Sequence, residues 1–123
     1  MATVEVKPNG SAVLGTAQTG NGDTTDIADR GFARGGGALV LTSTVGATPT
    51  VTVDIQGSID GTTWFNVPYS LVATPRTFVL TAITITTAVT TTYLLQESVG
   101  WRYLKVVRSA NTNVTLTTTY YAA

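Results

Sequence analysis

The chain has 123 residues, of which 11% are charged, and its seven basic and seven acidic side chains give a formal net charge of zero. It contains neither Cys nor His, which excludes disulfides, thiolate metal sites and the commonest general base of enzymes. It has no cluster of Lys and Arg and no apolar run of membrane-spanning length, so we expect one soluble domain that is not an enzyme, needs no cofactor and binds neither nucleic acid nor a membrane.

Threonine makes up about a fifth of the residues, and strong helix formers such as Glu and Lys are rare. Side chains that branch at Cβ lose rotamer freedom in a helix and pack well on a pleated strand. The composition therefore predicts an all-β protein.

The N-terminal segment, residues 1–22, is predicted to be an extended arm outside the main domain, which then covers residues 23–123. The segment has one short alternating stretch, is otherwise rich in Gly, Asn and Ser, and lacks the apolar stretch of a signal peptide. We expect the arm to be mobile in the isolated protein and to order in an assembly, by adding a strand to a neighbouring copy or by lying on the surface beneath. The apolar residues that would make this contact are Val4, Val6, Val13 and Leu14.

Short strands separated by turns are predicted along the rest of the chain. Turn sequences such as GATP, ATP, ESVG and SANTN separate them. Strands at roughly ten-residue spacing are typical of a sandwich or barrel. We predict a single antiparallel β-sandwich, jelly-roll-like or Ig-like, with strands at 38–45, 50–59, 62–68, 76–86, 90–97, 101–109 and 113–121.

The stretch VTVDIQGSIDGTTWFNVP is predicted to form a β-hairpin. Its first half alternates between apolar and polar residues, so Val51, Val53 and Ile55 are expected to face the core. Asp60 and Gly61 form a dipeptide that favours a type I′ turn, in which both central residues have positive φ. The hairpin therefore has an architectural explanation without any ligand.

Further positions on and near this hairpin allow more than one interpretation. Gly57 is expected to mark a bulge or a close approach of the backbone. Either Trp64 or Phe65 is expected to anchor the returning strand. Trp64 and Trp101 could instead form an aromatic platform for a sugar, although aromatic residues at such positions more often belong to a core or an interface.

Acidic residues provide two candidate sites, and for both we favour a structural explanation. Asp23, Asp26 and Asp29 offer carboxylates that could suit Ca²⁺, but their spacing matches no calcium loop, and a solvated loop or strand edge explains them. Asp54 and Asp60 could be imagined as a glycosidase pair. The polar face of a strand explains Asp54 and the turn explains Asp60, so we predict neither a metal site nor catalytic residues.

Two segments carry a resemblance to a known group of proteins. TPTVTVDIQGSIDGTTWFNVP and the later WRYLKVVRSANTNVTLTTTY resemble the small virion proteins of tailed bacteriophages, which are head decoration, head-fibre or minor capsid proteins; the similarity covers residues 37–120. The resemblance implies a non-catalytic protein, present in many copies, that binds the major capsid protein on the outer surface of the capsid. It also implies synthesis in the host cytoplasm, location in the virion and self-association, for which we expect a homotrimer.

A second resemblance provides the alternative function. SIDGTTWFNV with the later RYLKVV is similar to the hairpin and closing strand of discoidin-like carbohydrate-binding modules, which have a jelly-roll fold. It implies a module that attaches to surface glycans. Trp64 and Trp101 would then be its platform, but the loop residues that such modules use cannot be matched individually in this sequence.

Overall fold

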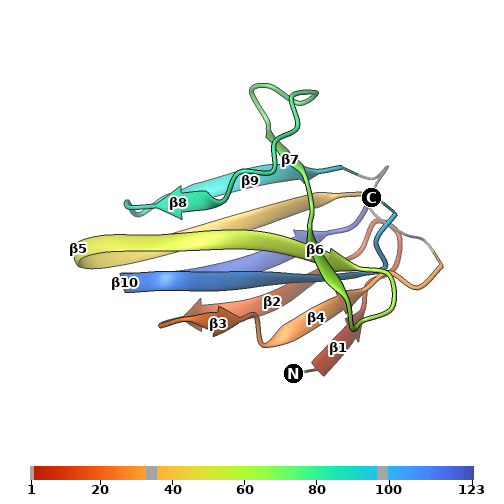
Figure 1. Cartoon of the computed structure of the whole chain (residues 1–123), viewed down its shortest axis with the longest axis horizontal. Helices are drawn as coiled ribbons and strands as arrows, with labels where there is room; N and C mark the ends of the chain where they lie inside the picture. Colours follow the sequence, from red (N-terminus) through yellow and green to blue (C-terminus); the bar gives the residue numbers. More distant parts are fainter. Residues whose placement is uncertain (1, 33–35, 97–99) are drawn as a thin grey trace.

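A computed structural model describes residues 2–32, 36–96 and 100–123. Every regular element in these residues is a strand, as the composition predicts, and no helix among them is long and apolar enough to cross a membrane. All ten strands belong to one hydrogen-bonded sheet (Figure 1). The strands are β1 (Ala2–Glu5), β2 (Ser11–Gln18), β3 (Gly22–Asp23), β4 (Asp26–Asp29), β5 (Ala38–Ser58), β6 (Trp64–Asn66), β7 (Tyr69–Leu71), β8 (Ile83–Ile85), β9 (Thr90–Leu95) and β10 (Tyr103–Tyr121).

Strands β5 and β10, of 21 and 19 residues, form the centre of the sheet. They pair antiparallel over nearly their whole length, from Ala38↔Tyr121 to Ser58↔Tyr103. Both bend about halfway, where their register is irregular. The GATP and SANTN sequences, which we expected to separate strands, therefore lie at bends within two continuous strands.

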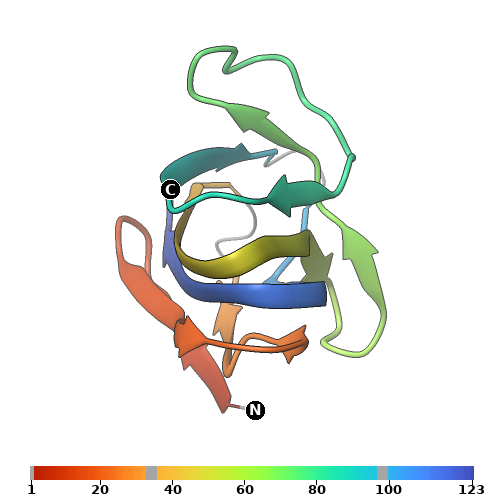
Figure 2. The ribbon, with the colours of Figure 1, turned by 90° about the vertical axis from the view of Figure 1, so that its left-hand side faces the viewer.

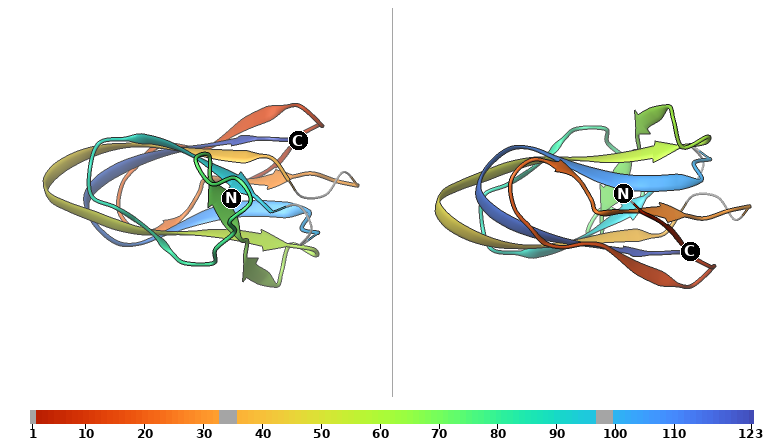
Figure 3. Two further views of the ribbon diagram at one scale, coloured as in Figure 1. Left: turned by 90° about the horizontal axis from the view of Figure 1, so that it is seen from above. Right: turned by 90° about the horizontal axis from the view of Figure 1, so that it is seen from below.

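The two bends fold the sheet onto itself (Figures 2 and 3). On one side of the bends the order is β7-β9-β5-β10-β2, and on the other side β5 and β10 pair with β6, β8, β3 and β4. The β2–β3 and β8–β9 connections turn at the same end as the two bends, so this end of the molecule is closed (Figure 3). The strands of the two halves diverge toward the opposite end, where the C-terminus lies.

The architecture differs from the predicted antiparallel sandwich in two ways. The two halves are parts of one continuous curled sheet, because β5 and β10 pass through the bend without interruption. The sheet is also mixed, since β1 pairs with β4 in parallel, from Ala2↔Asp26 to Glu5↔Asp29. Sequence alternation revealed the strands but could not show that consecutive strands were joined through a bend.

The hydrophobic core fills the inside of the folded sheet. Alternate residues of β5 and β10 point into it, as period-two patterning requires. Val51, Val53 and Ile55 are buried, with Leu104 and Val106 facing them from β10. Further core residues are Val6, Leu14, Ala28, Leu39, Leu41, Val67, Ile83, Ile85, Tyr93, Leu95, Trp101, Val114, Leu116 and Tyr120.

The described residues of the predicted N-terminal arm belong to this sheet and this core, so the structure shows no separate arm. β2 pairs with the C-terminal half of β10, and β1 pairs with β4. Leu14 is fully buried, Val6 is 2% exposed and Val4 is half-buried, whereas Val13 is 50% exposed. Of the four apolar residues that lacked a partner in the sequence, Val6 and Leu14 find one in the chain's own core, because the N-terminal segment lies beside strands that are distant in sequence.

Two buried arginines fasten this N-terminal segment to the rest of the chain. The guanidinium of Arg30 donates hydrogen bonds to the carbonyls of Val6 and Ala123, at 3.0 and 2.9 Å. Arg108 donates to two carbonyls of the β2–β3 turn and to the carbonyl of Asp23 in β3, at 2.8 Å for Thr19. Burial lowers the pKa of Arg108, and the nearby Asp23 opposes this shift. Main-chain carbonyls thus replace water around two charges that face inward.

If β2 is part of the core, truncating Leu14 will destabilise the protein far more than truncating its neighbour. We expect Leu14→Ala to lower the free energy of unfolding by about 2–5 kcal/mol, because it leaves a cavity at a fully buried position. Val13→Ala, at an exposed position on the same strand, should change it by less than about 1 kcal/mol. Urea unfolding of the two variants measures both values, and similar small losses would show that β2 does not contribute to the core.

Candidate functional site

The hairpin between β5 and β6 is closed by side-chain hydrogen bonds to the backbone. Five residues connect the paired Ser58 and Trp64, and of the Asp60-Gly61 pair only Gly61 has a positive φ, +81°. The predicted two-residue type I′ turn is therefore wrong. Asp60 Oδ1 accepts hydrogen bonds from the amides of Thr62 and Thr63, at 2.8 and 2.9 Å, and from the hydroxyl of Ser58. These donors lower the pKa of Asp60.

Gly57 marks a close approach of the backbone to the core. A Cβ added at this position would lie 2.8 Å from Cβ of Trp101 and 2.8 Å from Cγ2 of Val67. Trp101 is fully buried, and its ring meets the ring of Tyr120 edge to face, with 5.9 Å between the centroids. The proposed sugar platform of Trp64 and Trp101 is therefore wrong, since Trp101 has no exposed surface.

Trp64 is half-buried and packs against a cation. The ammonium of Lys105 lies 4.3 Å from the centroid of the Trp64 ring and 3.0 Å from Oδ2 of Asp23. Such cation–π contacts contribute roughly 0.5–1 kcal/mol at exposed sites. A sugar could stack on this indole only from the side that Lys105 leaves free.

The acidic residues considered as ligands or catalysts are explained by local structure. Asp29 forms a bidentate pair with Arg102, at 2.9 and 3.2 Å, and also accepts a hydrogen bond from the amide of Gly31. Asp54 lies within β5, opposite Val107 of β10, and Asp60 lies in the turn. Within the described ranges, no three acidic side chains converge on a possible metal position.

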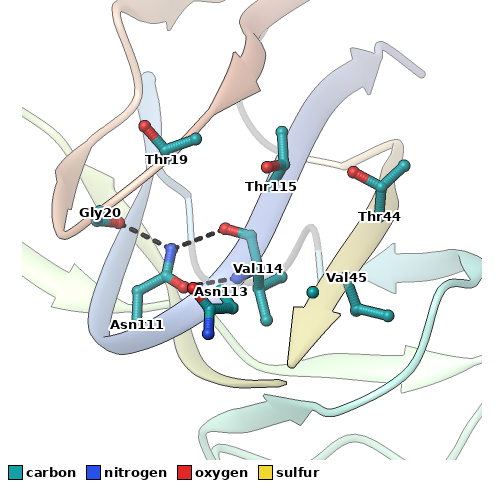
Figure 4. A pocket seen from close by; sticks show the side chains of 9 residues that line it. Thr19, Gly20, Thr44, Val45, Asn111, Asn113, Val114 and Thr115 are labelled. Carbon is teal, nitrogen blue, oxygen red and sulfur yellow. Dashed lines mark hydrogen bonds between the residues drawn. The ribbon is translucent and has the colours of Figure 1, made fainter. Parts of the chain in front are cut away.

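A groove of about 400 Å³ lies at the closed end, between the β2–β3 turn and the bends of β5 and β10 (Figure 4). Two amide side chains in it are bound to main-chain groups: Asn111 Nδ2 donates to the carbonyls of Gly20 and Val114, and Asn113 Nδ2 donates to Ala47. Its remaining side chains are mostly threonines, and it is lined by Thr19, Gly20, Thr44, Val45, Gly46, Asn111, Asn113, Val114 and Thr115. With its amides engaged and no charged or aromatic lining residue, the groove is best explained as part of the bend.

A projecting segment, residues 71–80, carries several exposed apolar side chains. It begins at the last residue of β7 and extends beyond the sheet at the top of Figure 1. Five of its apolar side chains are exposed: Leu71 47%, Val72 59%, Phe78 39%, Val79 40% and Leu80 59%. Large contiguous patches of exposed apolar side chains are typical of interaction sites. We call residues 71–80 the apolar projection.

The apolar projection was not predicted, because the sequence of residues 76–86 favoured a strand. In the structure only Ile83–Ile85 form β8, and Val79 makes an isolated bridge to Tyr69. A signal was present: LV and FVL flank a TPRT turn, and Arg76 is the only charged residue between positions 61 and 96. A strand of this length would bury one face, whereas all residues from 71 to 82 are exposed.

The ion pair of Asp29 and Arg102 predicts how the stability of the protein depends on pH. The hydrogen bond from Arg102 holds the pKa of Asp29 below its usual value of 3.8, so the unfolded chain takes up this proton first and stability falls as the pH falls below about 4. Asp29→Asn should lower the melting temperature at pH 7 by about 1–4 °C, given the exposure of the pair. Between pH 5 and pH 3, the melting temperature of this variant should fall less than that of the wild-type protein. Asp26→Asn, on the same strand, is the control; equal pH profiles for all three proteins would contradict the role of the pair.

No protein-family model matches the sequence, and no curated protein matches it. Among solved structures, the fold is similar to that of the SPBc2 prophage-derived protein YomS, with a TM-score of 0.58. The similarity covers 91% of each chain at 11% sequence identity. At this identity it shows that the two chains share a fold, across almost their whole lengths.

Proposed function

We propose that this chain is a non-catalytic structural protein of a tailed-phage virion, which binds the outer surface of the capsid in many copies. Its direct partners are the major capsid protein and further copies of itself. It is made in the host cytoplasm and resides in the virion.

The observation that carries the proposal is the fold, which is shared over 91% of both chains with a protein derived from a prophage. The sequence resemblance to small virion proteins, which is carried by the β5–β6 hairpin and by β10, supports the same proposal. The apolar projection adds a physical reason for a protein partner, because five exposed apolar side chains on one segment favour burial against another protein.

The alternative function, attachment to glycans, depends on Trp64. This ring is half-buried on the outer face of the sheet, and Tyr103 of β10 lies across β5 from it, with the guanidinium of Arg102 4.9 Å from the Tyr103 ring centroid. A sugar ring could stack on either aromatic side chain. The burial of Trp101 removes the second half of the platform that the sequence offered.

Binding to capsids tests the proposed function directly. The purified protein should co-sediment with capsids of its own phage that lack it, and binding should saturate at a fixed ratio to the major capsid protein. Capsids of an unrelated phage are the control. If the protein stays in the supernatant at concentrations well above those reached in an infected cell, the proposal is wrong.

A glycan array separates the two functions. We expect no glycan preference for the wild-type protein. A reproducible signal that disappears with Trp64→Ala, while Trp64→Phe retains part of it, would favour the alternative. Circular dichroism of both variants confirms that they are folded.

A further inference from the structure

Residues 61–96 form β6, β7, the apolar projection, β8 and β9, and Arg76 is the only charged residue among them. Charged groups of other segments approach this stretch at β6, where Lys105 lies over the Trp64 ring and Asp60 accepts hydrogen bonds from the amides of Thr62 and Thr63. The opposite edge of the sheet, with β1 and β4, carries three acidic residues, Glu5, Asp26 and Asp29. An edge without charges lacks the usual protection against pairing with another strand. We call residues 61–96 the uncharged flank.

The outermost strand-like segment of this flank is Phe78–Leu80. Val79 pairs with Tyr69 of β7 through two main-chain hydrogen bonds, at 3.0 and 2.9 Å. Because the main-chain groups of successive residues in an extended segment point to opposite sides, those of Phe78 and Leu80 point away from β7. Within the described residues, neither makes a main-chain hydrogen bond. The segment thus has a free edge with apolar side chains.

The composition of the flank fits contact with an identical copy. In a twofold contact residue i of one copy meets residue j of the other and residue j meets residue i, so a surface with charges of one sign brings like charges together. The β1 and β4 edge carries only acidic residues, Glu5, Asp26 and Asp29, whereas the flank has a single charged residue of its own, Arg76. Other copies of the chain are also present from synthesis onward, so a second copy can cover the apolar projection before the protein meets a capsid.

The composition of the apolar projection resembles that of an interface. Its five exposed apolar side chains are accompanied by exposed threonines at positions 74, 77 and 81. Apolar side chains surrounded by uncharged polar groups match the usual anatomy of an interface.

We propose that two copies of this chain associate about a twofold axis through the uncharged flank, with Phe78–Leu80 of each copy paired antiparallel to Phe78–Leu80 of the other. The pairing satisfies the free main-chain groups and buries both apolar projections. This dimer rests on the proposed function in one respect, because it names the surface through which a protein present in many copies would bind itself. It has two subunits, where we expected a homotrimer.

A lysine placed on the projection tests the contact. We expect wild-type protein to have the mass of a dimer by sedimentation equilibrium at micromolar concentration. Leu80→Lys should weaken association at least tenfold, because each lysine would place a charge opposite the apolar Phe78 of the other copy. Val13→Lys is the matched control: Val13 is 50% exposed, against 59% for Leu80, and lies on β2, away from the flank. This variant should remain a dimer.

Three results would overturn the proposal. They are a monomeric wild-type protein, a trimeric mass, or a dimer that Leu80→Lys leaves intact while circular dichroism shows the variant to be folded. The capsid co-sedimentation assay with Leu80→Lys then separates the two proposals. A monomeric wild-type protein whose capsid binding is lost in Leu80→Lys would assign the projection to the capsid, whereas a dimer that never binds capsids would leave the self-contact standing and reject the capsid function.

Discussion

The shared bend of β5 and β10 is the constraint on which the rest of the fold depends. Between the pairs Val45↔Val114 and Thr52↔Ser109, residues 46–51 of one strand face residues 110–113 of the other, so neither strand can bend unless its partner does. The bend requires left-handed backbone at Thr48, with φ of 49°, which costs a β-branched residue roughly 1–2 kcal/mol. Hydrogen bonds from the side-chain amides of Asn111 and Asn113 to neighbouring main-chain carbonyls offset part of this cost.

The bend also explains why an arginine can occupy a core position. Arg108 falls on the inward face of β10, in alternation with Val106, but it lies next to the bend, where the β2–β3 turn passes. There its guanidinium donates to two carbonyls of the turn, those of Thr19 and Gly20, and to the carbonyl of Asp23 in β3. One charged side chain therefore links the bend to the N-terminal strands. The groove lies beside them because four chain segments turn at this end of the molecule: the β2–β3 and β8–β9 connections and the bends of β5 and β10 (Figures 3 and 4).

The sequence predicted what depends on local alternation and missed what depends on distant pairing. The inward set Val51, Val53 and Ile55 follows from period two alone. GATP has the composition of a turn, and only its pairing with β10 makes it a bend within one strand. Likewise, nothing local distinguishes Leu14 of an exposed arm from Leu14 of a core strand, and nothing local shows that Trp101 packs beneath Gly57. These errors came from contacts between residues far apart in the chain, whereas the error at Asp60 and Gly61 concerned the geometry of a local turn.

The distribution of charge gives the two edges of the curled sheet different physical roles. At the β1–β4 edge, Asp29 is paired with Arg102 and Asp23 with Lys105, so charged groups are satisfied within the chain and the edge is protected by charge. At the β7–β9 edge, threonines and the apolar projection leave main-chain groups and apolar side chains without such protection. The proposed dimer would use the edge that lacks this protection and leave the edge that carries charges exposed.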